Sequence, residues 1–271
     1  MRTRSLTLVV AAAVSALALA ACGSSNGGGG ASPTPTGGAG SSAAVTPKVG
    51  VILPDSASSA RWETADRKYL TDAFTAANIQ FDIQNAGGDK AKFATICDSL
   101  IAGGVNVLMI VNLDSDTGSA CEKKAAAQGI KTIDYDRLTL GGGAAVYVSF
   151  DNVAVGKAEG DGLVQCLKAQ GVTSGTVDLL NGSPTDNNAT LFKQGYQAAI
   201  TGAGFTIGED QAVPDWDNTK AGTIFEQMFA KNPKIVGVDA ANDGLGGAAI
   251  AVLAKNGLAG KVPVTGQDAT D

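Results

Sequence analysis

Apolar residues recur along the first half of the chain in two alternating patterns, short runs and longer segments with helical spacing. Runs rich in Val, Ile, Leu and aromatic residues predict strands over residues 49–54, 81–84, 105–111, 130–135 and 146–150. Apolar positions three and four residues apart, together with glycines that are typical helix stops, indicate helices between these strands. The helices are expected over residues 62–77, 89–102 and 117–128.

The same alternation begins again after residue 151. Strands are expected over residues 176–180, 205–207, 234–239 and 262–265, and helices over residues 153–169, 188–201, 218–230 and 244–256. Strands of nearly continuous Val, Ile and Leu that alternate with helices are typical of a parallel sheet covered on both faces. We therefore predict an α/β protein with two tandem doubly wound, Rossmann-like parallel-sheet domains, residues 48–151 and 152–271.

The first 47 residues follow neither pattern. Arg2 and Arg4 precede an apolar run from Leu6 to Ala21, which is typical of a signal peptide, here residues 1–22. The run ends in Leu19-Ala20-Ala21-Cys22-Gly23, which resembles the lipobox of bacterial lipoproteins; a coincidental cysteine in an ordinary signal is the alternative. Residues 23–47 are nearly all small or polar, so we expect a flexible tether. A lipid on Cys22 would anchor the globular part at the outer face of a cell membrane.

Composition and charge narrow the possible functions. A length of 271 residues suits two domains, and the net charge of −6 argues against nucleic acid as a partner, because phosphate binding requires clustered Lys and Arg. The chain has no histidine, which excludes His-based catalytic triads and most zinc or iron sites. The glycine-rich run from Gly244 to Gly247 is a weak partial match to a dinucleotide fingerprint without the expected acidic partner. We expect neither a metal nor a cofactor.

Besides Cys22, the chain has three cysteines, Cys97, Cys121 and Cys166. Cys97 lies on the second predicted helix and Cys121 on the third, which pack side by side in a doubly wound sheet. Because an exported protein permits disulfides, we predict a bond between them, with two buried free thiols as the alternative. Cys166, beside Leu167, is expected to be a packed apolar thiol.

Polar and aromatic side chains follow several of the predicted strands. The clearest case is the strand over 130–135, which runs directly into Asp136 and Arg137. Strand ends of this kind line the ligand crevice of an open α/β sheet, and a carboxylate beside a guanidinium can hold adjacent hydroxyls of a small polyol. A turn closed by a local ion pair is the alternative. Comparable side chains after other strands are Arg61, Trp62, Asp186, Asn188, Trp216, Asn242 and Asp268.

Most of these further positions also have a purely structural interpretation. Arg61 and Trp62 can be a helix start with a core tryptophan. Asp186 and Asn242 each precede a predicted helix and can serve only as its cap. Trp216 lies between acidic residues and near a proline, as a surface loop aromatic does.

Several segments together resemble the type I periplasmic-binding-protein family, and within it the pentose binders of ABC importers. The resemblance covers residues 48–271. Its most specific segments are Ala60-Arg61-Trp62, Tyr135-Asp136-Arg137-Leu138, residues 147–152, Gly182-Ser183-Pro184-Thr185-Asp186-Asn187-Asn188-Ala189, and residues 257–268. It implies the type I periplasmic-binding-protein fold, with Trp62 and Trp216 on opposite faces of a sugar ring. It also implies contacts to that sugar from Arg61, Trp62, Asp136, Arg137, Asp186, Asn188, Trp216, Asn242 and Asp268.

The function that this resemblance implies is capture of a neutral monosaccharide, most closely D-xylose, between two closing domains. The protein would be a monomeric extracytoplasmic lipoprotein that delivers the sugar to an ABC permease and its ATPase. Glucose, galactose and arabinose remain alternatives, since binders of these sugars share the same kinds of segment. The family continues beyond the Gly-Gln-Asp strand with a return segment that brings a lysine to the sugar. This sequence lacks that segment, so either it is a fragment of a longer protein or its first domain lacks a strand and a helix. We expect a fold truncated at the C-terminus, with lower stability and weaker sugar binding than in a full-length version.

Three other functions are compatible with parts of the pattern. Asp136 and Asp268 could face each other as the carboxylates of a glycoside hydrolase, but an adjacent arginine favours the ionised form of Asp136 and makes it unfit as a general acid. A sugar-responsive repressor would carry a basic helix-turn-helix in place of the lipobox and tether. A receptor that presents its ligand to a chemosensory partner uses the same closing domains. Because Asp136 is unfit as a general acid, we expect that the protein is not an enzyme.

Overall fold

The computed structural model describes residues 47–270, and the first part of them forms a parallel sheet with the strand order β2-β1-β3-β4-β5. The strands are β1 (Lys48–Leu53), β2 (Gln80–Asn85), β3 (Val107–Ile110), β4 (Lys131–Tyr135) and β5 (Val146–Val148). Between them lie a π-helical turn, η1 (Trp62–Asp66), and the helices α1 (Arg67–Ala76), α2 (Lys90–Ala102) and α3 (Ser115–Ala127). We call residues 48–151 the first lobe.

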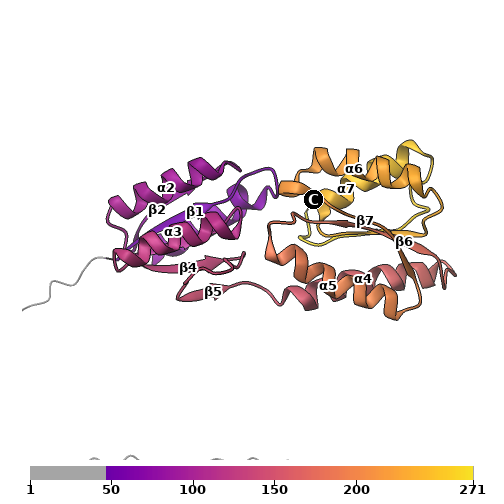
Figure 1. Cartoon of the computed structure of the whole chain (residues 1–271), viewed down its shortest axis with the longest axis horizontal. Coiled ribbons are helices and arrows are strands. Elements are labelled where there is room, and N and C mark those ends of the chain that lie inside the picture. The colour runs from indigo at the N-terminus through magenta and orange to yellow at the C-terminus, as the bar shows by residue number, and fades with distance from the viewer. Residues whose placement is uncertain (1–46, 271) are drawn as a thin grey trace, which may run out of the picture. The chain divides into compact units, whose positions relative to one another are not determined.

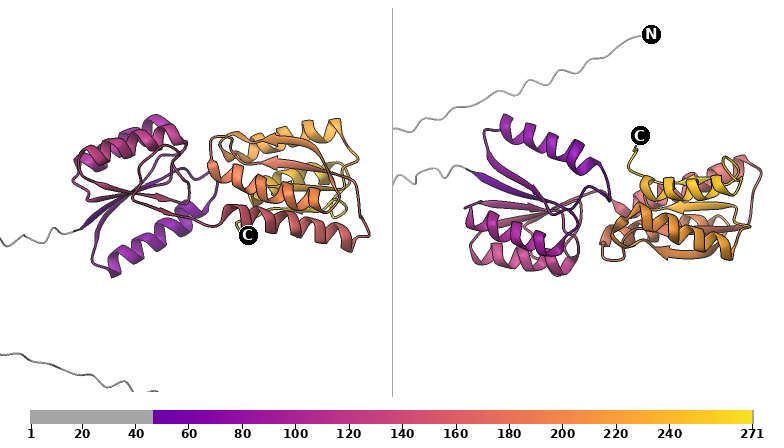
Figure 2. Two further views of the ribbon diagram at one scale, coloured as in Figure 1. Left: turned by 60° about the horizontal axis from the view of Figure 1, so that its bottom comes forward. Right: turned by 90° about the horizontal axis from the view of Figure 1, so that it is seen from above.

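Helices cover both faces of this sheet. α1 lies on one face, and α2 and α3 lie side by side on the other (Figures 1 and 2). The side chains of β1 alternate accordingly, as the pleat of a strand requires. Val51 and Leu53 pack with Trp62 in one cluster, whereas Ile52 packs with Phe93 of α2 in another.

The remaining residues, 152–270, form a second parallel sheet with the strand order β7-β6-β8-β9, and we call them the second lobe. Its strands are β6 (Thr176–Asn181), β7 (Thr206–Ala212), β8 (Gly237–Ala240) and β9 (Val264–Thr265). α4 (Asn152–Ala169) and α5 (Asn187–Gly202) cover one face, and α6 (Asn218–Lys231) and α7 (Asp243–Lys255) cover the other (Figure 1). Both sheets belong to the same compact unit of the chain. The predicted α/β fold with parallel sheets is confirmed.

Most helices begin directly after a strand or a short loop, at an Asp or Asn that caps them. The caps Asp114, Asp151, Asp186, Asp217 and Asn242 each accept a hydrogen bond from a backbone N–H in the first turn of the following helix. An Asx side chain satisfies donors that the helix itself leaves free. These polar residues therefore gather where the carboxyl ends of the strands meet the helix starts.

β7 is longer than the sequence predicts, because it continues past Ile207 to Ala212. Its additional residues are mainly polar, and Glu209 and Asp210 pair with lysines 231 and 193. An edge strand exposes one side to water and needs no continuous apolar run. Hydrophobicity alone therefore ended the prediction too early.

The cysteines give one expected and one unexpected result. Cys97 of α2 and Cys121 of α3 form a disulfide with their Cα atoms 5.9 Å apart, which is the pair expected from the sequence. Cys166 is exposed, so its prediction as a packed thiol is wrong. In α4 the buried stripe includes Leu163 and Leu167, and the helical rotation of about 100° per residue turns Cys166 away from it.

The predicted signal peptide, Cys22 and nearly all of the tether lie outside the described residues. Among the helices that the structure does describe, none combines the length and apolar character required to cross a membrane.

Candidate functional site

A cavity of about 60 Å³ lies among loops that follow the strands of both sheets. Every ligand-binding residue expected from the sequence lines it. These residues are Arg61, Trp62, Asp136 and Arg137 from the first lobe, and Asp186, Asn188, Trp216, Asn242 and Asp268 from the second.

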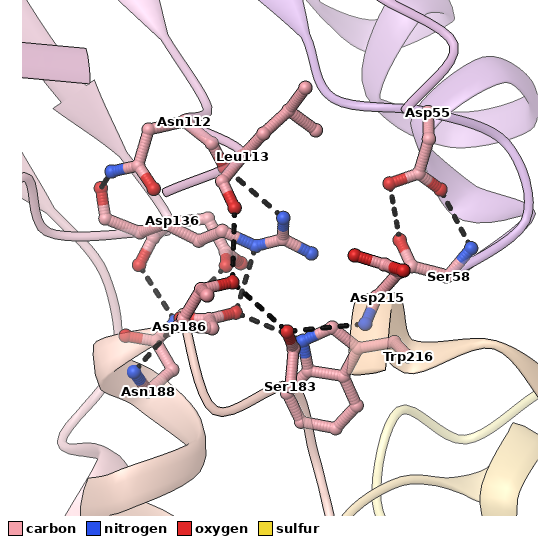
Figure 3. Close-up of polar contacts among 12 residues, drawn as sticks. Asp55, Ser58, Asn112, Leu113, Asp136, Ser183, Asp186, Asn188, Asp215 and Trp216 are labelled. Atoms are coloured by element: carbon pink, nitrogen blue, oxygen red, sulfur yellow. Dashed lines mark hydrogen bonds and ion pairs between the residues drawn. The ribbon is translucent and has the colours of Figure 1, made fainter. Parts of the chain in front are cut away.

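Asp136 is fixed at the end of β4 by an unusual backbone conformation. Its φ is +65°, in the left-handed region that Asp tolerates better than most residues. The N–H of Asp136 donates to the carbonyl of Val148 at 2.8 Å, and its own carbonyl accepts from the Ser149 hydroxyl at 2.7 Å. Asn188 of the second lobe donates to the same carbonyl at 3.0 Å and to the Asp136 carboxylate at 3.2 Å (Figure 3).

The two charged residues at the end of β4 pair with separate partners. The carboxylate of Asp136 lies 2.5 Å from Arg61 Nη2, and Arg137 Nε lies 2.9 Å from Asp186 Oδ2 across the two lobes. Arg137 and Asp186 are both almost fully buried. The alternative of a local ion pair between neighbours is therefore wrong, and the two side chains point into a shared polar site.

Burial and neighbouring charges shift several pKa values in this site. Burial raises the pKa of Asp268 to about 6, although the positive charge of Arg61 opposes the shift. Burial also raises the pKa of Asp186 against the attraction of Arg137. For Arg61, burial disfavours the charged form, but Asp136 and Asp66 outweigh it and its pKa is raised. Asp268 is thus mostly ionised at neutral pH, without a direct ion-pair partner among the described residues.

Both tryptophans are buried and hydrogen-bonded through their indole N–H. Trp62 Nε1 donates to the hydroxyl of Ser58 at 3.1 Å, and the guanidinium of Arg61 lies 4.1 Å from the centre of the Trp62 ring. Trp216 Nε1 donates to Asp186 Oδ2 at 3.1 Å, as Figure 3 shows. The alternative that Trp216 is a surface loop aromatic is wrong, since only 5% of it is exposed.

The other structural interpretations hold together with the placement at the cavity. Asp186 caps α5 with its Oδ1 and uses its Oδ2 for Arg137 and Trp216. Asn242 caps α7 by accepting from the N–H of Leu245 at 2.9 Å, and it also lines the cavity. A capping residue at this edge can therefore still present polar atoms to a ligand.

Six lining residues were not among the expected ligand contacts. Asn152 starts the helix after the last strand of the first sheet, and Phe192 lies one turn after Asn188 on α5, a spacing that places both on the same helix face. That spacing is the signal that could have identified Phe192. The full set is Ser58, Ser59, Phe150, Asn152, Phe192 and Gln267.

The site is rich in planar groups that form hydrogen bonds. Carboxylates accept, guanidinium groups donate and amides do both, so together they can satisfy the donors and acceptors of adjacent hydroxyls. Within residues 47–270, no group of three or more acidic or cysteine side chains is arranged to hold a metal ion. These side chains are of the kinds that can bind a small polar molecule.

Comparison with known proteins places this architecture in a family. The family model described as "Periplasmic binding protein domain" matches residues 49–271, which is most of the chain. The chain belongs to this family. This periplasmic binding protein is 34% identical to the D-xylose-binding periplasmic protein of Escherichia coli (strain K12), over 82% of this chain and 67% of that protein. It spans about two thirds of the length of the xylose-binding relatives that it matches.

Two solved structures are similar to this periplasmic binding protein. An ABC transporter solute-binding protein of Actinobacillus succinogenes 130z with bound D-allose is 25% identical, with a TM-score of 0.72 over 82% of this chain and 78% of that one. A carbohydrate transporter solute-binding protein of Chloroflexus aurantiacus with D-glucose is 28% identical, with a TM-score of 0.70 over 83% and 74%.

Proposed function

We propose that this protein is the extracytoplasmic solute-binding component of an ABC importer and that it captures a neutral monosaccharide. D-xylose is the first candidate. The observation that carries the proposal is that the cavity is lined from both lobes by two indoles and by forked polar side chains. An indole covers the C–H face of a sugar ring, and carboxylates, amides and guanidinium groups bind its hydroxyls. The two lobes, residues 48–151 and 152–270, would be the two domains that close on the sugar.

The choice of sugar rests on the sugars that similar proteins are named for or hold. The curated relative at 34% identity is named for D-xylose, whereas the two structures at 25% and 28% identity hold D-allose and D-glucose. We therefore place D-xylose first and a hexose second. Discrimination between them depends on how the pocket accommodates one hydroxymethyl group. A group of that size changes the binding free energy only by a small amount.

Binding would proceed by exchange of partners within the site. A cavity of about 60 Å³ has room for only about four to six water molecules, which is less than a monosaccharide needs. Side chains that now bind one another, such as Arg61 with Asp136, would turn to sugar hydroxyls. Hydrogen bonds to charged groups, at about 1.5–3 kcal/mol each, can together supply the roughly −8 kcal/mol of micromolar affinity.

The membrane part of the proposal concerns residues outside the described range. A lipid on Cys22 would anchor the protein to the outer face of the cell membrane, and the small polar residues that follow would allow it to reach its permease. Mass spectrometry of the mature protein is expected to find a diacylated N-terminal cysteine. A mature chain that starts at another residue would contradict the anchor and leave the sugar site unaffected.

Calorimetric titration tests the sugar site. We expect D-xylose to bind most tightly among D-xylose, D-glucose, D-allose, D-galactose and L-arabinose. The variants Trp216→Ala and Asp268→Asn should each weaken binding at least about tenfold, because each removes a direct contact. Asp98→Asn, a charge change on the exposed surface of α2, should leave affinity unchanged. Unchanged affinity in both site variants would overturn the assignment.

A further inference from the structure

The loop that follows β4, residues 136–143, carries Arg137 and forms several hydrogen bonds with α3. We call it the Arg137 loop. Ser119 of α3 donates to the carbonyl of Gly141 at 3.0 Å, and the N–H of Leu140 donates to the hydroxyl of Ser115 at 3.0 Å. The N–H of Gly143 donates to the buried carboxylate of Glu122. The loop is thus held against α3 at three points.

Asn112, at the end of the neighbouring strand β3, contacts Arg137 twice. Arg137 Nη1 donates to the carbonyl oxygen of Asn112 at 3.2 Å, and Asn112 Nδ2 donates to the carbonyl oxygen of Arg137 at 3.3 Å. Only 2% of Asn112 is exposed, and it does not line the cavity. Figure 3 shows its amide turned away from the site, toward the backbone of the Arg137 loop.

Thr139 connects this contact to the sheet. Its hydroxyl accepts from Asn112 Nδ2 at 2.9 Å and donates to Asp134 Oδ1 at 2.7 Å, and its N–H donates to Asp134 Oδ2 at 2.7 Å. Asp134 lies in β4 and is almost fully buried. A Cβ added at Gly118 would lie 2.7 Å from the Thr139 hydroxyl, so α3 leaves just enough room for this arrangement.

These contacts form a chain from the buried strand β4 through Thr139 and the side-chain amide of Asn112 to the backbone carbonyl of Arg137. The backbone carbonyl of Asn112 in turn accepts from the guanidinium of Arg137. A long arginine side chain loses rotational freedom when it binds a ligand, and an arginine that is already held loses less. Arg137 is held on one side by the carbonyl of Asn112 and on the other by Asp186. Its planar donor face is therefore set before any ligand arrives.

We infer that Thr139 and Asn112 are positioning residues for Arg137, which set the affinity of the site without touching the ligand. The inference rests on the proposed function, since the ligand contact of Arg137 is part of it. Within residues 47–270, Arg137 is the one cavity-lining residue to which Asn112 is hydrogen-bonded, so we expect the effect of both residues on binding to disappear when that guanidinium is replaced.

Calorimetric titration of five variants with the sugar that binds the wild type tests the inference. Thr139→Val removes the hydroxyl and keeps the shape, and we expect it to raise Kd about tenfold. Thr139→Ser keeps the hydroxyl and should stay within about twofold of wild type. When Thr139→Val is added to Arg137→Lys, Kd should rise less than about twofold above that of Arg137→Lys alone. Tyr196→Phe removes a buried hydroxyl that donates to Asn181 in the second lobe and should leave Kd unchanged.

Three outcomes would overturn the inference. The first is an unchanged Kd in Thr139→Val. The second is a Kd in Thr139→Ser that rises as much as in Thr139→Val. The third is a full tenfold rise in Kd when Thr139→Val is added to Arg137→Lys. If wild type binds no sugar of the panel, the proposed function fails, and a ligand-free measurement decides the inference alone.

That measurement is the exchange of the Arg137 Nε–H with water, followed by NMR in the ligand-free, ¹⁵N-labelled protein. The signal is assigned by its loss in Arg137→Lys. We expect exchange to become several-fold faster in Thr139→Val and to stay the same in Tyr196→Phe. Equal exchange rates in wild type and Thr139→Val would show that the hydroxyl does not position Arg137.

Discussion

Two acidic residues of the second lobe are buried without adequate partners. Glu159 of α4 is 6% exposed, and neither of its carboxyl oxygens has a hydrogen-bond partner within residues 47–270. Burial raises the pKa of Glu159 to about 9, with a further contribution from the negative charge of Asp239. Burial likewise raises the pKa of Asp239 to about 7. Glu159 therefore keeps its proton at neutral pH in the folded state.

This proton makes stability depend on pH. An unfolded Glu159 ionises near its ordinary pKa of about 4.3, whereas the folded residue holds its proton up to about pH 9. The free energy of unfolding therefore falls as pH rises between these values. Glu159→Gln cannot ionise, so we expect its melting temperature to exceed that of wild type increasingly from pH 5 to pH 8.5. Parallel melting curves across this range would contradict the burial of an uncharged Glu159.

Gly182 illustrates how a single missing side chain shapes the site. A Cβ added at Gly182 would lie 2.0 Å from Cη2 of Trp216, so Gly182→Ala must displace that indole. We expect a loss of about 1–3 kcal/mol in stability, as overpacking usually causes, together with weaker ligand binding. Gly222→Ala is the matched control, because its Cβ would meet nothing within 4 Å on α6. That variant should be neutral or more stable by up to about 1 kcal/mol.

At the scale of elements, strands and helices with strong apolar patterns were predictable, and the exceptions have physical causes. β7 continues through polar residues because it lies at a sheet edge, where backbone pairing requires no apolar run. Cys166 sits among apolar neighbours in sequence, but its position on the turn of α4 faces solvent. Local composition predicted both elements. It did not show where the edge strand β7 ends or which side of α4 faces the core.

The disulfide between α2 and α3 is expected to contribute strongly to the stability of the first lobe. Cys97 and Cys121 are 24 residues apart, and a loop of that size corresponds to about 3.5 kcal/mol in the chain-entropy model. The double variant with both cysteines changed to alanine should therefore lower the free energy of unfolding in urea by about that amount. Cys166→Ala, a change of an exposed thiol, is the control and should have no effect. Equal stability of all three proteins would show that the bond does not form in solution.

At the scale of the whole molecule, the site exists only where the two lobes meet. Its nine expected residues could be named from the sequence, because they follow predicted strands and seven of them, all but Trp216 and Asn242, occur in the segments that most resemble a known family. Their mutual pairing could not, since the contact between Arg137 and Asp186 joins residues that follow strands of different sheets. Phe150 was missed although it lies in one of these segments, because it ends an apolar run that predicts a strand and so does not stand out as a lining residue.

A ligand that bridges both lobes should stabilise them together. At a ligand concentration about one hundred times Kd, binding adds about 2.7 kcal/mol to the free energy of unfolding. We expect a single thermal transition that moves to higher temperature with added sugar. Trp216→Ala should need at least about ten times more sugar for the same shift. Separate transitions, of which only one responds to sugar, would contradict a site shared by both lobes.

Trp62 and Trp216 are all the tryptophans that the chain contains, and both line the same cavity. Indole fluorescence of this protein therefore originates entirely at the site, without background emission from elsewhere. The guanidinium of Arg61 lies 4.1 Å from the centre of one of these rings, so a solute that displaces it alters the surroundings of a fluorophore directly. The molecule thus contains an intrinsic optical sensor of its own occupancy, and no added dye is needed to follow binding.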